Sequence, residues 1–127
     1  ILTRIDIEKP RKGTVMKHLK TGRLTSDIAV VNAAAALEMD SHKCRKCRLA
    51  AGSVAPTPLR LHKTEAIIEG AEITPDLLEE VQKVASREVM PITDVRSTEE
   101  YRRQVAGVMV KRAISEALRN DSQVCAA

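Results

Sequence analysis

Aromatic side chains are almost absent from this sequence of 127 residues, which contains one Tyr and no Phe or Trp. A core must therefore be built from Val, Ile, Leu, Ala and Met, and hydrophobic residues do make up 43% of the chain, as in globular proteins. The scarcity of aromatics argues against nucleic acid as a partner, because proteins that bind single strands stack the bases on aromatic rings. The length predicts a single domain covering residues 1–127.

Long apolar runs are also missing, which excludes a membrane-spanning helix of the usual roughly 18 residues. The longest run, residues 28–37, is rich in Ala and contains Asn32. No signal peptide opens the chain, and three cysteines, an odd number, favour free thiols in a reducing compartment. These features predict a cytoplasmic protein. The first residue is Ile rather than Met, which we interpret as a fragment or a processed piece.

The sequence lacks a recognisable catalytic constellation. It has only five glycines, widely spaced, and no Gly-rich loop that could cradle a phosphate. His18, His42 and His62 are scattered and have no Ser or Asp partner that would suggest a triad. The acid pairs 79–80 and 99–100 fall where helix starts or exposed helix faces are expected, so we interpret them as solvated charges. We therefore predict no catalytic residue in this chain.

One short motif, His42-Lys-Cys44-Arg-Lys-Cys47, has the Cys spacing of a zinc or redox site. No second pair of ligands completes a tetrahedral site, and Cys125 lies far away near the end of the chain. If the segment is a strand, Cys44 and Cys47 point to opposite faces, because they are an odd number of residues apart. The motif predicts incidental thiols and no metal site, with a small zinc or redox protein as a remaining alternative.

Charge is distributed unevenly along the chain. Residues 1–63 hold 13 Lys and Arg against 5 Asp and Glu, a formal charge of +8, whereas residues 64–127 hold 8 against 12, or −4. A basic half attracts an anionic cofactor, an acidic partner or nucleic acid. Within it, Lys17, Lys20 and Arg23 form a cluster that is either a solvated sheet edge or a contact for an anionic cofactor or phosphate.

The first part of the chain, residues 1–54, has mainly the patterns of strands. Residues 1–7 alternate apolar and polar side chains, the period of a half-buried strand, and residues 14–20 predict a second strand. The run 28–38 favours a helix by its four consecutive alanines, but pairing it with 44–54 across a polar turn is the simplest account. We therefore predict four strands.

The second part, residues 57–119, has the patterns of helices. Thr57 and Pro58 open a first helix that Gly70 ends in the left-handed conformation. Thr74 and Pro75 open a second helix, in which apolar residues recur at helical spacing.

Residues 97–100 form a capping box that opens a third helix, which runs to about Arg119. A frayed tail, residues 120–127, follows it. Together these elements predict an α+β domain, in which an antiparallel sheet of three to four strands is followed by three helices packed on one face.

Three runs together resemble one known family. They are Asp27-Ile-Ala-Val-Val-Asn-Ala-Ala-Ala-Ala-Leu37, Cys44-Arg-Lys-Cys-Arg-Leu-Ala-Ala-Gly-Ser-Val-Ala-Pro-Thr-Pro-Leu-Arg60 and Ile92-Thr-Asp-Val-Arg-Ser-Thr-Glu-Glu-Tyr-Arg-Arg103. In this order they look like the C-terminal domain of the FAD-binding, or medium, subunit of molybdenum hydroxylases, which include the carbon monoxide dehydrogenase flavoprotein and xanthine dehydrogenase. The similarity covers about residues 1–119. It implies a small antiparallel sheet with three helices on one face.

The resemblance also implies where this domain would touch FAD. In the family, FAD lies mostly on a preceding N-terminal domain, which this sequence does not contain. The C-terminal domain adds a contact from its opening strand, at the position of Leu2, and a lysine before the Asp-Ile-Ala run. Lys20 is the best match, but its spacing to Asp27 is one residue short, so Lys17 remains an alternative. The family often has two consecutive arginines before the Asp, but here Leu24 follows Arg23, so the second arginine is missing.

For the complete enzyme, the resemblance implies oxidation of a small substrate at molybdopterin and passage of electrons through iron–sulfur clusters to FAD. FAD would relay them to an acceptor. The implied partners are the missing FAD-binding domain, an iron–sulfur subunit and a molybdopterin subunit. The isolated chain is then a non-catalytic part of an oxidoreductase. A stand-alone module that binds an anion or nucleic acid through the basic first half is the alternative.

Overall fold

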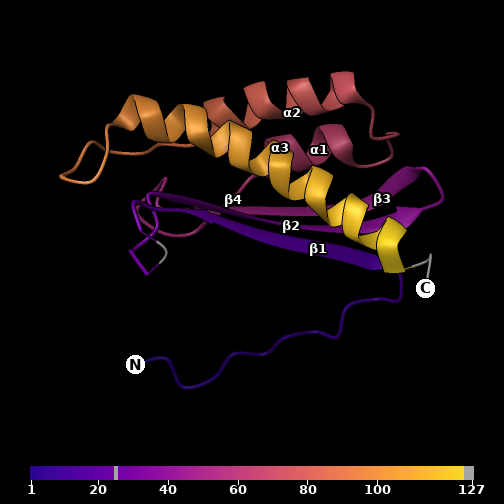
Figure 1. Cartoon of the computed structure of the whole chain (residues 1–127). Coiled ribbons are helices and arrows are strands. Elements are labelled where there is room, and N and C mark those ends of the chain that lie inside the picture. Colours follow the sequence, from indigo (N-terminus) through magenta and orange to yellow (C-terminus); the bar gives the residue numbers. More distant parts are fainter. Residues whose placement is uncertain (25, 125–127) are drawn as a thin grey trace.

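A four-stranded antiparallel sheet with three helices on one side forms the structured body of this protein. The structure is a computed structural model that describes residues 1–24 and 26–124. In chain order the elements are β1 (Thr14–Thr21), β2 (Val31–Asp40), β3 (Lys43–Gly52), β4 (Leu59–Arg60), α1 (His62–Ile68), α2 (Pro75–Glu88) and α3 (Glu99–Val124). The strands lie side by side in the order β1-β2-β3-β4 (Figure 1). The predicted α+β layout is confirmed.

The Ala-rich run is a strand, as the pairing argument and the resemblance predicted, although Ala favours helices. Its alternate residues Ala33 and Ala35 are 0% and 3% exposed and face α3. The buried residues of α3 include small ones, Ala106, Ala113 and Ala117, beside the larger Met109, Val110 and Ile114. Small side chains on both surfaces allow close packing of the helix on the sheet, and this tertiary contact outweighs the local propensity.

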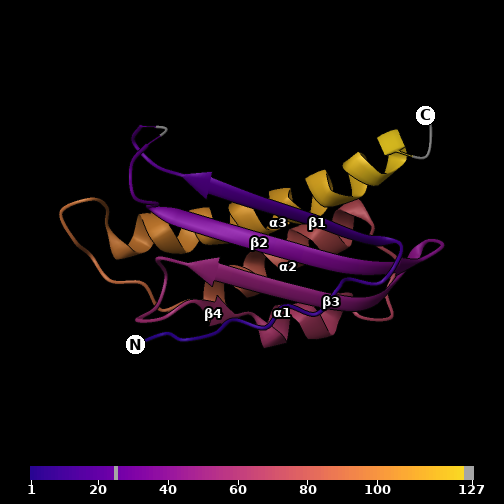
Figure 2. The same ribbon diagram turned by 90° about the horizontal axis from the view of Figure 1, so that it is seen from below.

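The prediction of a strand over residues 1–7 is wrong. Residues 1–13 are exposed and contain no strand, and they run along the side of the sheet opposite the helices (Figures 1 and 2). A strand needs a neighbour to hydrogen-bond with, and no described part of this chain pairs with the segment. The fourth strand is instead β4, which pairs with β3 through Ala50 and Arg60.

Two helix boundaries also differ from the predictions. Because Leu59 and Arg60 join the sheet, α1 begins at His62 rather than at Pro58. Gly70 follows α1 with a φ of 82°, in the left-handed conformation that was predicted. At the other end of the chain, α3 continues to Val124, past the expected start of the tail, and residues 125–127 lie outside the described part.

The caps of the two long helices match the sequence signals closely. The Thr74 hydroxyl accepts a hydrogen bond from the Leu77 N–H at 3.2 Å, and Pro75 occupies the first turn of α2. In α3 the cap is Thr98, whose hydroxyl accepts from the Tyr101 N–H at 3.2 Å, one residue later than the predicted Ser97. Both helices therefore start where a side-chain oxygen satisfies a free backbone donor.

Candidate functional site

The side of the sheet that faces away from the helices is the candidate site. Side chains alternate along each strand, so every second residue of β1, β2 and β3 points to this side. We call this surface the open sheet face, and the strand register arranges its residues in four rows. The rows are Lys20–Asn32–Gly52, His18–Ala34–Ala50–Arg60, Met16–Ala36–Arg48 and Thr14–Glu38–Lys46. Figure 2 views the sheet from this side, on which the N-terminal segment also lies.

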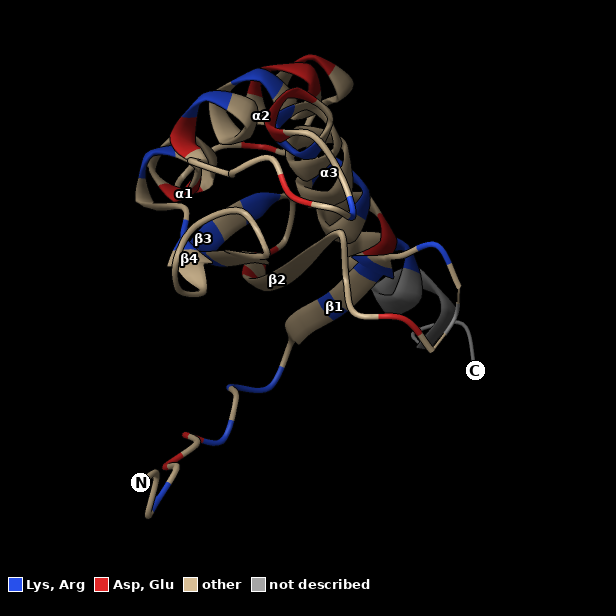
Figure 3. Ribbon diagram, turned by 90° about the vertical axis from the view of Figure 1, so that its left-hand side faces the viewer, with Lys and Arg blue, Asp and Glu red and all other residues tan. Residues whose placement is uncertain are grey.

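The open sheet face combines small apolar side chains with positive charge. Alanines form its centre on β2 and β3, and cations lie on β1 and β3 around them (Figure 3). Arg60 is neutralised by Glu65, which accepts two hydrogen bonds from its guanidinium at 2.8 Å each. Glu38 pairs with Arg45. Arg48 has no ion-pair partner among the residues that the structure describes, so the surface stays net basic.

The two candidate lysines lie on opposite sides of the sheet. Lys17 points toward the helices, where its ammonium meets the Glu116 carboxylate of α3 at 2.9 Å and lowers the pKa of Glu116. Lys20 lies on the open sheet face at the end of β1, and its Nζ donates to the Asp27 carbonyl oxygen at 3.0 Å. Of these two lysines, Lys20 is therefore the one placed to meet a ligand that lies against the open sheet face.

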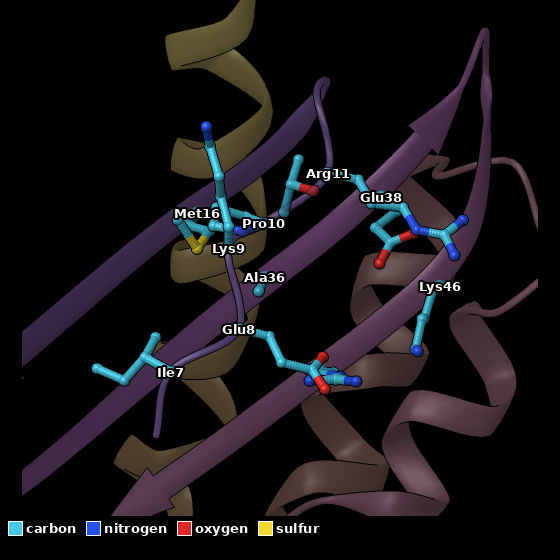
Figure 4. Close-up of a pocket in the computed structure, with 11 residues that line it drawn as sticks. Ile7, Glu8, Lys9, Pro10, Arg11, Met16, Ala36, Glu38 and Lys46 are labelled. Carbon is cyan, nitrogen blue, oxygen red and sulfur yellow. The ribbon is translucent and has the colours of Figure 1, made fainter. Parts of the chain in front are cut away.

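Leu2 lies in the exposed N-terminal segment, with 77% of its surface accessible. The start of this segment is at the same end of the sheet as the Lys20 row (Figures 1 and 2). Farther along, the segment forms a hollow of about 310 Å³ with the far end of the open sheet face (Figure 4). Ile7, Pro10, Met16, Ala36 and Glu38 line it, and Lys20 does not. The N-terminus and the end of β1 therefore lie at the same end of the sheet, and neither Leu2 nor Lys20 lines this hollow.

The two cysteines of the motif both point into the core, contrary to the prediction of opposite faces. Residue pairing between β2 and β3 shifts at Met39, which faces Cys44, while Glu38 faces Lys46. This bulge leaves Arg45 without a partner and turns both thiols the same way, so Cys44 is 0% and Cys47 1% exposed. A hydrogen bond with Cys44, together with burial, raises the pKa of the Cys47 thiol, and both are free cysteines.

In the described part of the chain, neither a metal cluster nor a membrane helix accompanies these features. Among residues 1–24 and 26–124, no group of three or more His, Cys, Asp or Glu side chains is arranged to hold a metal ion. None of the helices in the described part of the chain is long and apolar enough to cross a membrane. Cys125, the third cysteine of the sequence, lies outside that part.

One cluster that the sequence reasoning did not single out is centred on Asp94. Its carboxylate accepts hydrogen bonds from Arg96 at 2.7 Å and from Arg102 at 2.6 Å. Arg102 is 3% exposed and also donates to the Ser53 carbonyl oxygen at 3.0 Å. The cluster therefore ties the loop before α3 to the loop after β3. The Asp-x-Arg spacing was visible as a family signature, but its partner Arg102 lies eight residues away from Asp94.

Comparisons with known proteins agree with this architecture. The model of the CO dehydrogenase flavoprotein C-terminal domain family matches residues 17–117. The carbon monoxide dehydrogenase medium chain of Afipia carboxidovorans is 32% identical over 92% of this chain and 41% of its own length. The xanthine dehydrogenase FAD-binding subunit of Escherichia coli is 30% identical over 87% of this chain and 38% of its own.

A solved structure gives the same result in three dimensions. The structure of carbon monoxide dehydrogenase from Hydrogenophaga pseudoflava superimposes on this chain with a TM-score of 0.82 and 30% sequence identity. The superposition covers 86% of this chain and 38% of the matching chain. The chain thus spans about two fifths of the length of these curated relatives. With most of its length matched in both sequence and fold, the chain belongs to the CO dehydrogenase flavoprotein C-terminal domain family.

Proposed function

We propose that this chain is the C-terminal domain of an FAD-binding subunit in a molybdopterin-dependent dehydrogenase or hydroxylase, where it helps to seat FAD. The observation that carries the proposal is the position of Lys20. Within a domain of this family, Lys20 lies on the open sheet face, whereas Lys17 is paired with Glu116 on the helix side. The isolated chain is then a binding part of an oxidoreductase and not itself a catalyst.

The residues of the open sheet face fit FAD chemically. FAD carries a diphosphate, and a Lys ammonium stabilises negative charge nearby through charge-assisted hydrogen bonds. The net basic surface around Lys20 supports the same polarity. Leu2, exposed in the N-terminal segment, would offer an apolar side chain for the flat faces of the flavin ring. FAD would supply the electron transfer, and this chain would bind and orient it.

In the complete enzyme, we infer that FAD receives electrons from iron–sulfur clusters and relays them to an acceptor. The partners would be the FAD-binding domain of the same subunit, an iron–sulfur subunit and a molybdopterin subunit. This inference is supported by the names of the relatives, which are a medium chain and an FAD-binding subunit. The open sheet face would then be covered by the FAD-binding domain.

The test compares the isolated chain with the full-length subunit that contains it. We expect the full-length subunit to hold FAD stoichiometrically, and the isolated chain to bind it weakly or not at all. A colourless full-length subunit that takes up no added FAD would overturn the proposal. Salt-dependent binding of the isolated chain to nucleic acid would instead support a stand-alone anion-binding module, to which Arg48 and Lys46 of the open sheet face would contribute.

Lysine substitutions make the test specific to the site. We expect Lys20→Ala to weaken FAD binding by about tenfold, the effect of losing one charged hydrogen bond. Lys17→Ala is the matched control, because it removes the ion pair with Glu116 on the other side of the sheet. The FAD dissociation constant of each full-length variant is measured by quenching of flavin fluorescence. Equal losses in the two variants would exclude a direct role for Lys20.

A further inference from the structure

Gly52 is distinguished by the space above it and not by its backbone conformation. Its φ is not in the left-handed region that favours glycine, unlike the φ of Gly13 and Gly70. A Cβ atom at position 52 would lie 2.7 Å from both Oδ1 and Nδ2 of Asn32. A real Cβ atom essentially never lies this close to another heavy atom, so the end of the Asn32 side chain would have to turn away to admit one. The side-chain amide of Asn32 therefore lies directly over Gly52, in the space that the missing Cβ leaves.

The Asn32 amide has unused hydrogen-bonding capacity. It makes no hydrogen bond with any residue that the structure describes, although the side chain is half-buried. A carboxamide offers two N–H donors and a carbonyl acceptor, and leaving such a group unpaired as it becomes buried is unfavourable. The amide is held on the open sheet face, next to Lys20 in the same row. Its donors and its acceptor are therefore available to a ligand that lies against this face.

We propose that Asn32 is a cofactor-binding residue whose amide hydrogen-bonds to the polar edge of the flavin ring, with Gly52 keeping open the space that the amide occupies. This inference rests on the proposed function, because it takes FAD as the ligand. The edge of the flavin ring carries carbonyl oxygens and an N–H group, so it needs both donors and an acceptor. Asn32 supplies both, whereas the Lys20 ammonium supplies donors only.

The experiment uses the full-length subunit with FAD removed and then titrated back. We expect Asn32→Ala to raise the FAD dissociation constant by about tenfold, as the loss of one or two hydrogen bonds would. Asn32→Asp should in addition lower the midpoint potential of the bound flavin, because a nearby negative charge disfavours the gain of electrons. Gln104→Ala is the matched control, since it truncates an exposed carboxamide on α3, on the other side of the sheet. It should leave both quantities unchanged.

A double-mutant cycle separates the role of Gly52 from a folding defect. We expect Gly52→Ala to weaken FAD binding about as much as Asn32→Ala, because the new methyl group displaces the amide. In the double variant the clash is gone, so the combined loss should be no larger than that of Asn32→Ala alone. Additive losses would show that Gly52 acts through something other than Asn32.

Three results would overturn the inference. The first is wild-type FAD affinity in Asn32→Ala while the unsubstituted subunit binds FAD, which leaves the proposed function intact. The second is a loss of FAD affinity in Asn32→Ala that is accompanied by a lower melting temperature of the FAD-free variant. This result would mark Asn32 as a structural residue. The third is a full-length subunit that binds no FAD at all, and only this result also removes the proposed function.

Discussion

At the scale of single residues, Asp94 connects more parts of this protein than its position in a loop suggests. Its carboxylate accepts side-chain hydrogen bonds from Arg96 and Arg102 and also backbone N–H bonds from Arg96 and Ser97. The hydrogen bonds from Arg96, reinforced by the one from Arg102, hold the pKa of Asp94 well below its usual range. The buried Arg102 guanidinium depends on this carboxylate for its charge compensation.

The lowered pKa of Asp94 gives a pH dependence with a definite sign. Its stabilising contribution is complete above the ordinary Asp pKa of about 3.9 and is lost as the pH falls toward the lower folded-state pKa. We expect Asp94→Asn to lower the melting temperature of the isolated chain at pH 7 and to flatten the further loss of stability below about pH 4. The control is Asp76→Asn at an exposed position of α2. Identical acid unfolding profiles for Asp94→Asn and the unsubstituted chain would contradict this account.

At the scale of elements, local sequence patterns predicted the features that depend on residues close to one another in the chain. The Thr74 cap, the left-handed Gly70 and the pairing of the Ala-rich run with β3 all follow from neighbouring residues. The strand over residues 1–7 was wrong because no described part of the chain pairs with it, and an alternating pattern does not report whether a partner strand is present. The bulge at Arg45 was missed because it depends on how two strands pair.

The candidate site shows the same limit. The resemblance led to Lys20 and Leu2, but it left Lys17 open, because only the strand register assigns each lysine to a side of the sheet. The Asn32–Gly52 pair was not foreseen at all. The two residues are twenty positions apart, and their contact requires both the β2–β3 register and the absence of a Cβ atom.

The packing of α2 against α3 depends on a glycine in the middle of a long helix. A Cβ at Gly107 would lie 2.2 Å from the Ser86 hydroxyl and 2.3 Å from the Gln82 carbonyl oxygen of α2. In an isolated helix, Gly→Ala stabilises by about 1 kcal/mol. Here the gain in helix propensity is opposed by a clash with a backbone atom that cannot turn away.

We therefore expect Gly107→Ala to destabilise the chain by about 1–3 kcal/mol, the usual effect of overpacking. Urea unfolding, followed by the helical circular dichroism signal, measures this difference. Gln104→Ala, at an exposed position of the same helix, should change stability little. Adding Ser86→Gly to Gly107→Ala should recover only part of the loss, because the Gln82 carbonyl oxygen remains. A Gly107→Ala chain as stable as the unsubstituted one would show that the helices move apart freely.

At the scale of the whole molecule, the two sides of the sheet are unequal. The helices bury one side, whereas the open sheet face presents alanines and Met16, which is 55% exposed. Antiparallel sheets that face water usually carry polar side chains there, and contiguous apolar surface marks an interaction site. Because the chain spans about two fifths of its relatives, the proposed function requires the rest of the subunit to cover this face.

A charge placed on the open sheet face distinguishes a covered surface from a solvated one. Ala36 lies between Met16 and Arg48, so Ala36→Glu in the isolated chain adds a half-exposed carboxylate beside a cation. We expect its melting temperature to stay within a degree or two of the unsubstituted value, since surface substitutions usually change stability by less than about 0.5 kcal/mol.

In the full-length subunit the same carboxylate would be trapped between domains, where an unmatched charge is costly. We expect Ala36→Glu to lower FAD retention there and to expose the domain junction to limited proteolysis. The matched control is Ala66→Glu, the same substitution at an exposed position of α1 on the other side of the sheet. If Ala36→Glu and Ala66→Glu behaved alike in the full-length subunit, the open sheet face would be solvated there, and another surface of this domain would have to meet the FAD-binding domain.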